Sequence, residues 1–347
     1  MGSWAKALVA LLAAIAVGTA GALILAAADG GHVKEDPSLA AEHAAAHDRY
    51  IAALEAERAE LKANRRGASR EQNSHKIEPA SAGTNGTPGQ SAAQSTGQQS
   101  GSFGQLESEV SGEIGVAYAP LGSSGFQQLG RLEVGHAWSS FKVPIVVSVM
   151  LEEHGSLTSE QESMAASAIT ASDNAAAASL FNDLEATTHG AASQAIESVL
   201  SQVPGGATQV ATAPPPPGAV SSWGQTEWTL SASSAFYGAL ACGQYGPADN
   251  VVALMEQVVP EQQWGLGQAN FPAGTRVAYK AGWGPDGSES GPYLVRQAGI
   301  LRAPSGTGAV VTIAAQDSSG SFEAGVADLN RVADWVAENV PLGSGSC

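Results

Sequence analysis

The pattern of apolar and polar positions divides the chain into an apolar start, a polar middle and a long mixed region. Residues 7–28 carry no charge and would form a helix about 33 Å long, enough to cross the core of a bilayer. Ala26, Ala27 and Ala28 also provide the small side chains of a signal-peptide cleavage site. The pattern therefore predicts either an uncleaved membrane anchor over residues 1–28 or a signal peptide cleaved after Ala28. Both interpretations predict an exported protein.

Two polar segments follow the apolar start. Residues 29–66 are rich in Ala, Glu and Leu with apolar side chains at helical spacing, which predicts a helical stalk. Residues 67–104 are mostly Gly, Ser, Thr, Gln and Asn, which predicts a flexible linker. The folded domain is then expected over residues 105–347.

The pattern within residues 105–347 mixes strands and helices. Apolar runs at 114–119 and 126–130 flank a Gly-Ser-Ser-Gly turn and predict a hairpin of strands. Helices are predicted from Ser139 to His154 and after the capping box of Thr158 and Gln161. Three later strands and a last amphipathic helix are predicted at 276–282, 293–301, 309–315 and 326–340. Strands at both ends of a helical middle indicate an α/β (α+β) fold with one antiparallel sheet.

Composition narrows the possible functions. The 33 acidic residues outnumber the 16 basic ones, so the formal charge is −17, which argues against a nucleic-acid partner. The two cysteines, Cys242 and Cys347, exclude a disulfide-rich scaffold and a thiolate metal cluster, and the histidines form no zinc-binding helix. A Cys242–Cys347 disulfide requires the C-terminal tail to fold back. We expect no metal and no cofactor, and we expect a monomer.

Lysine is the informative residue of the domain, because residues 105–347 contain only Lys142 and Lys280. Lys142 follows Ser139 by three positions, which places both side chains on one face at a helix start. A lysine with a lowered pKa at that position can accept the proton of the serine hydroxyl. The spacing Ser-x-x-Lys is weak evidence alone, because serine is abundant in this chain.

Two further short motifs have ordinary structural readings when each is taken alone. Ser172-Asp173-Asn174 precedes an Ala-rich helix and would serve as a helix N-cap. Lys280-Ala281-Gly282 ends a predicted strand, where Gly282 leaves room for a ligand along the strand edge.

Together the three motifs resemble the signature set of class A β-lactamases and penicillin-binding proteins, which is Ser-x-x-Lys, Ser-Asp-Asn and Lys-Thr-Gly. They occur in the same chain order, with Ala281 in place of Thr. Residues 112–117 also resemble the first strand of that family, and the resemblance covers residues 105–347. Residues 224–228 and 280–285 are similar to a group of exported actinobacterial serine hydrolases. The resemblance implies a five-stranded antiparallel sheet with the N- and C-terminal helices on one face and an all-helical subdomain.

The resemblance also implies a role for each matched residue. Ser139 would be the acylated nucleophile, Lys142 its base, and Ser172 the proton relay to the leaving group. Lys280 would supply positive charge beside Ser172 and toward a substrate carboxylate, and Asn174 would hold the substrate amide. The backbone N–H groups of Ser139 and Trp283 would form the oxyanion hole. Arg296, on the next strand, is either a second carboxylate-binding group or a surface charge, whereas His136 is expected to be structural.

The chain departs from the family pattern in three ways. Only 33 residues separate Ser139 from Ser172, which is short for class A enzymes, and Ala281 lacks the hydroxyl that helps to bind a carboxylate. No Asp or Glu occurs between Glu197 and Glu227, where class A enzymes carry the glutamate that activates the deacylating water. Instead, this loop contains the polyproline stretch 214–217.

Three functions remain as alternatives. The first is an exported serine acyl-transfer hydrolase that acts on a small molecule or peptide, such as a peptidoglycan-like peptide or a related amide or ester. The second is a class A-like β-lactamase with a non-standard deacylation base. The third is a non-catalytic binding domain of the cell envelope.

Overall fold

The computed structural model describes residues 91–216, 219–246, 248–286 and 292–347. The predicted anchor, the stalk and the first part of the linker lie outside the described residues. Within the described part of the chain, no helix combines the length and apolar character that a membrane span needs.

A five-stranded antiparallel sheet forms the centre of the domain, with the strand order β2-β1-β7-β6-β5. The predicted α/β fold with one antiparallel sheet is therefore confirmed, as is the pairing of the first two strands as a hairpin. The strands are β1 (Glu113–Pro120), β2 (Gln127–Gly130), β5 (Arg276–Pro285), β6 (Tyr293–Arg302) and β7 (Gly308–Asp317). The inner strands are buried along almost their whole length, because helices cover both faces of the sheet.

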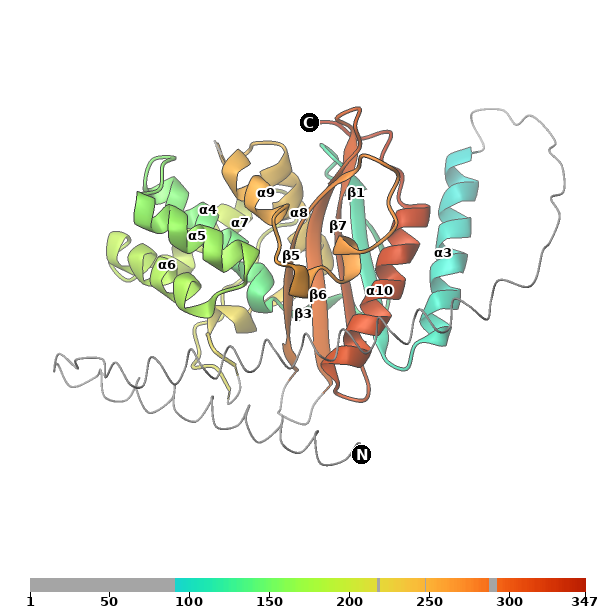
Figure 1. The fold of residues 1–347 in the computed structure, drawn as a ribbon, viewed down its shortest axis with the longest axis horizontal. Helices are drawn as coiled ribbons and strands as arrows, with labels where there is room; N and C mark the ends of the chain where they lie inside the picture. Colours follow the sequence, from blue (N-terminus) through green and yellow to red (C-terminus); the bar gives the residue numbers. More distant parts are fainter. Residues whose placement is uncertain (1–90, 217–218, 247, 287–291) are drawn as a thin grey trace, which may run out of the picture. The chain divides into compact units, whose positions relative to one another are not determined.

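One face of the sheet is covered by the first and last described helices, α3 (Ser91–Glu109) and α10 (Phe322–Asn339), as Figure 1 shows. The predicted apolar stripe of α10 is confirmed, since Leu329, Ala333 and Val336 are buried against this face. The expectation of N- and C-terminal helices on one face is also confirmed.

Helix α3 corrects the predicted boundary of the domain. The linker was expected to continue to residue 104, but α3 begins at Ser91. Phe103 is buried, and its ring meets that of Trp335 on α10 edge to face with centroids 5.0 Å apart. A single aromatic residue in a polar segment thus anchors a helix that composition alone assigned to the linker.

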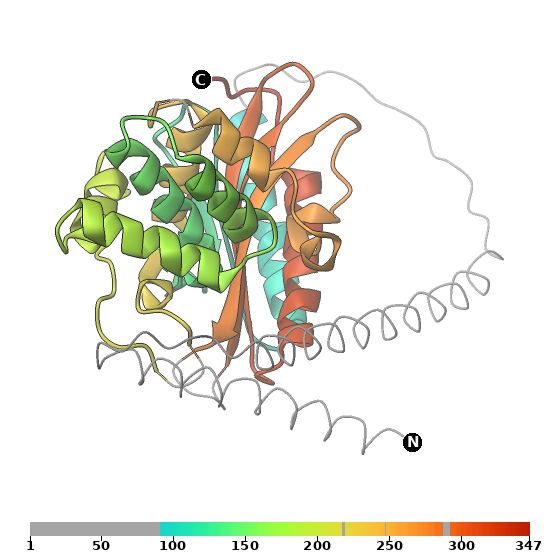
Figure 2. The ribbon, with the colours of Figure 1, turned by 60° about the vertical axis from the view of Figure 1, so that its left-hand side comes forward.

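The opposite face of the sheet is covered by α8 (Leu230–Ala241), as Figure 1 shows. Beyond α8 lies a region made of helices, which comes forward in Figure 2. The predicted helical subdomain is confirmed, and the capping box of Thr158 and Gln161 is present at the start of α5. Its helices are α4 (Lys142–Glu152), α5 (Ser159–Thr170), α6 (Asn174–Thr187), α7 (Ala192–Ser201) and α9 (Asp249–Met255).

Two short strands, β3 (Val134–His136) and β4 (Glu227–Thr229), form a separate two-stranded sheet. Neither strand was predicted from the sequence, because three residues give too short a pattern to recognise. Strand β3 leads directly into a 3₁₀ turn, Trp138–Phe141, which precedes α4.

Helix α4 therefore starts at Lys142, three residues later than predicted. Pro144, which has no backbone N–H, is compatible with this start. Pro144 falls in the first turn of α4, where backbone N–H groups have no partner within the helix, so the missing N–H is not required.

The C-terminal tail folds back over the end of the sheet. The carbonyl of Gly345 accepts a hydrogen bond from the backbone N–H of Gly308, at 2.7 Å. Cys347 then forms a disulfide with Cys242, the C-cap residue of α8. The condition for this bond, which the sequence left open, is thus met.

Candidate active site

The predicted nucleophile lies on the 3₁₀ turn between β3 and α4. Trp138, directly before Ser139, has a φ of 48°, a left-handed conformation that side chains other than glycine rarely adopt. Ser139 is partly exposed, whereas Ser140 is buried and donates its hydroxyl to the carbonyl of Ala137. Of these two neighbouring serines, only Ser139 is therefore open to a substrate.

Strand β5 holds this turn from the other side. A Cβ atom on Gly282 would lie 2.6 Å from Ala137 O, 2.8 Å from Ser140 N and 3.0 Å from Ser139 N. No larger residue fits at position 282 unless the turn moves. The glycine predicted to leave room for a ligand therefore first leaves room for the backbone of the nucleophile turn.

Lys142, at the first position of α4, points toward the loop between α5 and α6. Its Nζ donates to Asn174 Oδ1 at 2.7 Å, to the carbonyl of Ser172, and to Ser172 Oγ at 3.3 Å. Among the described residues, Lys142 makes no hydrogen bond to Ser139. The structure thus brings Lys142, Ser172 and Asn174 into direct contact.

Lys280 reaches the same hydroxyl group from β5. Its Nζ lies 2.9 Å from Ser172 Oγ and 3.1 Å from the carbonyl oxygen of Ala281, and the residue is only 1% exposed. Ser172 has a φ of 61°, so the loop between α5 and α6 holds it in a left-handed conformation between the two lysines. The helical region and the sheet therefore meet at Ser172.

Burial determines the charge of both lysines. Removal from water lowers the pKa of Lys142 to about 7, although the carboxylate of Asp173 opposes this shift. Burial and the nearby charge of Lys142 lower the pKa of Lys280 well below its usual value. A neutral amine at Lys142 is thus accessible near neutral pH.

The predicted oxyanion hole depends on the outer edge of β5, which is the terminal strand of the sheet. In such a strand, every second residue directs its N–H and C=O groups away from the neighbouring strand. Ala281 and Trp283 are two residues apart, so their backbone N–H and C=O groups point to the same side of the strand. The indole ring of Trp283 packs on Trp264, with centroids 5.8 Å apart.

Arg296 does not lie where a substrate carboxylate could meet it. It pairs with Gly282 across the sheet and points to the expected face, but it is 0% exposed. Its Nη1 donates to the carbonyls of Gly135 and Trp228, both at 3.0 Å. Strands β3 and β4, which were not predicted, cover this position. Burial therefore contradicts both sequence interpretations of Arg296, the carboxylate-binding group and the surface charge.

The acid-free loop between Glu197 and Glu227 brings no carboxylate into the site. Glu197 itself accepts a hydrogen bond from the backbone N–H of Val210, at 2.8 Å, and so ties the loop to α7. The backbone N–H of Ala211 in turn bonds to the hydroxyl of Thr226, at 3.1 Å. The described part of this loop is thus held by hydrogen bonds from its backbone N–H groups to side chains, and it presents no general base.

Two contacts near the nucleophile turn were not predicted. His136 Nδ1 lies 2.8 Å from Asp286 Oδ1, and this ion pair raises the pKa of His136 and lowers that of Asp286. The hydroxyl of Tyr237, buried on α8, donates to the carbonyl of Ser140 at 2.9 Å. Neither pair has a sequence signature, because the partners are far apart in the chain.

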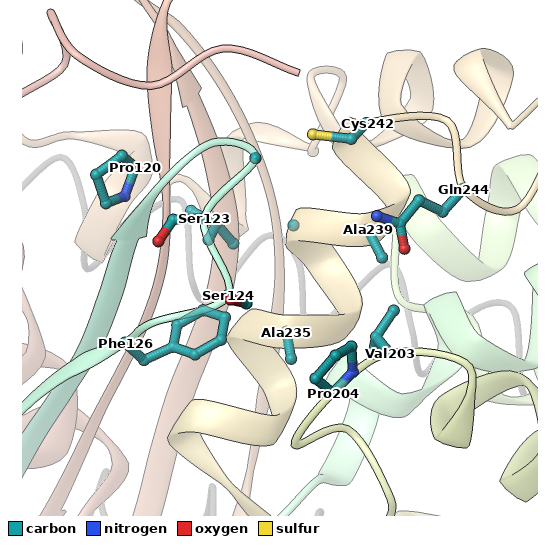
Figure 3. Close-up of a pocket in the computed structure, with 13 residues that line it drawn as sticks. Pro120, Ser123, Ser124, Phe126, Val203, Pro204, Ala235, Ala239, Cys242 and Gln244 are labelled. Atoms are coloured by element: carbon teal, nitrogen blue, oxygen red, sulfur yellow. The ribbon is translucent and has the colours of Figure 1, made fainter.

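A separate pocket of about 90 Å³ lies between the β1–β2 turn, α8 and the segment after α7 (Figure 3). Phe126, Val203 and Ala235 form part of its wall, and Cys242 lies at one end. None of the predicted site residues lines this pocket. It is therefore distinct from the candidate active site.

Comparison with solved structures places this architecture among known folds. An ancestral class A β-lactamase is 20% identical with a TM-score of 0.55, and covers 70% of this chain and 99% of its own. The chromosome-encoded β-lactamase of Vibrio parahaemolyticus is 15% identical with a TM-score of 0.56, and covers 69% of this chain and 98% of its own. A β-lactamase of Xanthomonas campestris pv. campestris is 16% identical with a TM-score of 0.56, and the match covers 71% of this chain and 99% of that β-lactamase.

These likenesses show that the chain has the class A β-lactamase fold, which confirms the fold implied by the three motifs. No family model and no curated protein matches the chain.

Proposed function

We propose that the protein is an exported serine acyl-transfer hydrolase that forms an acyl-enzyme on Ser139. Its substrates would be peptidoglycan-like peptides or related amides and esters. The observation that carries this proposal is the meeting of Lys142 and Lys280 at Ser172 Oγ, beside the turn that exposes Ser139. Two buried amines without a carboxylate hydrogen-bond partner are costly for folding alone, and they are suited to proton transfer.

The first step would be proton removal from Ser139 by Lys142. A neutral amine has two N–H groups and one lone pair. The carbonyl of Ser172 and Asn174 Oδ1 can only accept, so they occupy both N–H groups. The lone pair is then left to accept the hydroxyl proton of Ser139 as its oxygen attacks the substrate carbonyl.

The second requirement is stabilisation of the negative charge on the tetrahedral intermediate. The backbone N–H groups of Ser139 and Trp283 would donate to this oxygen, since Gly282 allows β5 to approach the turn. Such a donor is typically worth about 10²–10³ in rate.

The third step would be protonation of the leaving group by Ser172. Its oxygen accepts from Lys280 and, once Lys142 has taken the proton of Ser139, from Lys142 as well, so its own proton is free to be donated into the cleft. As the carbon–heteroatom bond breaks, the proton passes from Ser172 to the leaving group. Lys142, which holds the proton of Ser139, then restores the hydroxyl of Ser172.

Hydrolysis of the acyl-enzyme would be slow with bulky acyl groups. The described part of the 198–226 loop presents no acid to activate a water molecule, and the whole loop contains no Asp or Glu. With a β-lactam, acylation should therefore outrun deacylation by orders of magnitude.

Export of the domain is supported by the Cys242–Cys347 disulfide, since such bonds persist mainly in oxidising compartments. The apolar residues 7–28 would act as the anchor or the signal. Fusion of a reporter enzyme that is active only outside the cell membrane, placed after residue 347, tests this part of the proposal. Inactivity of the reporter would contradict export.

The decisive experiment combines a fluorescent penicillin with a neutral fluorophosphonate probe on the full chain, followed by mass spectrometry of the labelled peptide. A label on Ser139 from either probe supports the proposal. Turnover of several penicillin molecules per second would favour a β-lactamase with a non-standard base. No label from either probe would favour a non-catalytic binding domain.

A further inference from the structure

Among the described residues, the candidate site contains no exposed cation that could bind a substrate carboxylate. Residues 105–347 contain seven arginines and lysines and three histidines, and all ten lie among the described residues. The hydrogen-bond partners and the positions of these ten residues therefore determine whether the site can bind a negatively charged group of a substrate.

The three basic residues nearest the site are buried, and each donates at least one hydrogen bond, although Nε and Nη2 of Arg296 are buried without a partner among the described residues. Lys142 and Lys280 are 0% and 1% exposed and share Ser172, and Arg296 is 0% exposed and donates to backbone carbonyls. Ala281, where the family motif has a threonine, is 1% exposed within an apolar cluster. The strand edge beside Ser139 thus lacks both the cation and the hydroxyl that would meet a carboxylate.

The other arginines lie outside the site. Arg276 pairs with Glu256 at 2.8 Å, and its position on β5 is about 14 Å from that of Lys280 at about 3.4 Å per residue. Arg131 pairs with Glu107, and Arg331 with Glu109. Arg302, at the far end of β6, donates to the carbonyl of Ala241.

The histidines do not change this result. His136 is paired with Asp286 at 2.8 Å. His154 and His189 follow the C-terminal ends of α4 and α6, whose N-terminal ends form the site, so both lie a helix length away.

Acidic residues border the site instead. Asp173 is exposed between Ser172 and Asn174, and Glu227 on β4 is exposed opposite His136. An anionic group close to the scissile bond would therefore meet like charge without a compensating partner.

We infer that this site takes acyl donors that carry no carboxylate next to the scissile bond, namely neutral esters, thioesters or internal amides. This inference rests on the proposed function and narrows its substrate class. Within a peptide, the site would cleave an internal bond in preference to one that releases a C-terminal residue with a free carboxylate.

The test compares two thioesters of phenylacetylglycine on the full chain, with release of the thiol followed by its absorbance. One leaving group is mercaptoacetate, which is anionic, and the other is its methyl ester, which is neutral. After correction for their rates of alkaline hydrolysis, the neutral thioester should have the higher kcat/KM, by about tenfold, which corresponds to about 1.4 kcal/mol.

Salt dependence gives a second readout whose sign separates the alternatives. Raising the ionic strength from about 0.01 M to about 1 M shortens the screening length from about 30 Å to about 3 Å. Because like charges repel, kcat/KM for the anionic thioester should rise with salt, while that for the neutral thioester stays constant. A fall with salt for the anionic thioester would reveal a cation that binds it and would overturn the inference.

The variant Asp173→Asn keeps a good helix cap and removes one charge. We expect it to raise the ratio of anionic to neutral kcat/KM by about twofold to fivefold, as weak repulsion in water allows. Asp334→Asn on α10 is the matched control and should leave the ratio unchanged. An equal ratio in both variants and the parent, together with a preference for the anionic thioester, contradicts the inference.

The result also separates this inference from the proposed function. Reaction of Ser139 with the neutral fluorophosphonate, together with a preference for the anionic thioester, overturns the inference alone. No reaction of Ser139 with any of the probes overturns the proposed function and the inference with it.

Discussion

Lys142 and Lys280 converge on one hydroxyl group, with their Nζ atoms 3.3 Å and 2.9 Å from Ser172 Oγ. One lysine belongs to the helical region and the other to the sheet. Burial disfavours a charge on either amine, and the charge of Lys142 further disfavours a charge on Lys280. The pair can therefore hold and release a proton with little change in geometry, which is what an acyl-transfer site requires.

Substitution of Ser139 by Ala should abolish acylation, whereas Ser140→Ala should retain most of it. Only Ser139 is accessible, because Ser140 is buried and bonded to Ala137. Labelling with the fluorophosphonate probe measures both variants, and mass spectrometry locates the adduct. An adduct on a different serine in Ser139→Ala would show that the nucleophile is misassigned.

The rate of acylation should rise with pH through about 7, the lowered pKa of Lys142. Below this pKa the amine is protonated and cannot accept a proton, so the rate should fall about tenfold per pH unit. Above it the rate should reach a plateau. Single-turnover labelling between about pH 5 and 9 gives the profile, and a flat profile would rule out Lys142 as the base.

Replacing Gly282 by Ala should slow acylation by about 10²-fold, comparable to the loss of one oxyanion donor. The added Cβ would lie within 3.0 Å of three backbone atoms of residues 137–140, so the turn must move away from β5. Gly125→Ala is a suitable control, since its Cβ meets no atom closer than 4.0 Å. Equal rates for both variants would show that the contact between β5 and the turn is not needed.

Arg296→Met should slow acylation by about 10²-fold, while the free energy of unfolding changes little or increases. A buried cation without a carboxylate partner adds little to stability, but its bonds to β3 and β4 position the nucleophile turn. Arg302→Met on the same strand is the matched control and should acylate normally. Thermal unfolding and labelling rates, measured together, separate the two effects. A normal rate in Arg296→Met would contradict this positioning role.

Loss of the Cys242–Cys347 disulfide should destabilise the domain by about 4–5 kcal/mol, as expected for a loop of about 100 residues in the chain-entropy model. Cys242→Ser and Cys347→Ser should have equal effects, and the double variant should be no worse. Chemical denaturation with and without a reductant measures the change. Insensitivity of the parent protein to the reductant would show that the bond is not formed in solution.

The fold could be predicted from the sequence largely because strands and helices kept their ordinary patterns. The capping box at Thr158 and the apolar stripe of α10 are local features, and both formed as predicted. Strands β3 and β4 are held by pairing with each other and by hydrogen bonds from the buried Arg296. Because these contacts are not local in the sequence, no local pattern predicted the two strands.

The candidate site could be predicted where it is built from residue types that are rare in this domain and that stand in short motifs. The scarcity of lysine pointed to Lys142 and Lys280, and the structure brings both to Ser172. Arg296 was misinterpreted because its position on the strand predicted the correct face of the sheet but not the burial of its side chain. The His136–Asp286 pair was missed because it joins residues 150 positions apart.

Strand β1 lies between β2 and β7 in the sheet, although β7 follows β1 by almost two hundred residues in the chain. The hairpin of β1 and β2 can form early, but its apolar edge stays open until the last strands have been made. A chain that crosses a membrane in the order of its residues would therefore carry an unfinished sheet to the far side. We expect folding of this domain to be completed only after its C-terminal strands arrive, and the unfinished sheet to be most prone to aggregation during this interval.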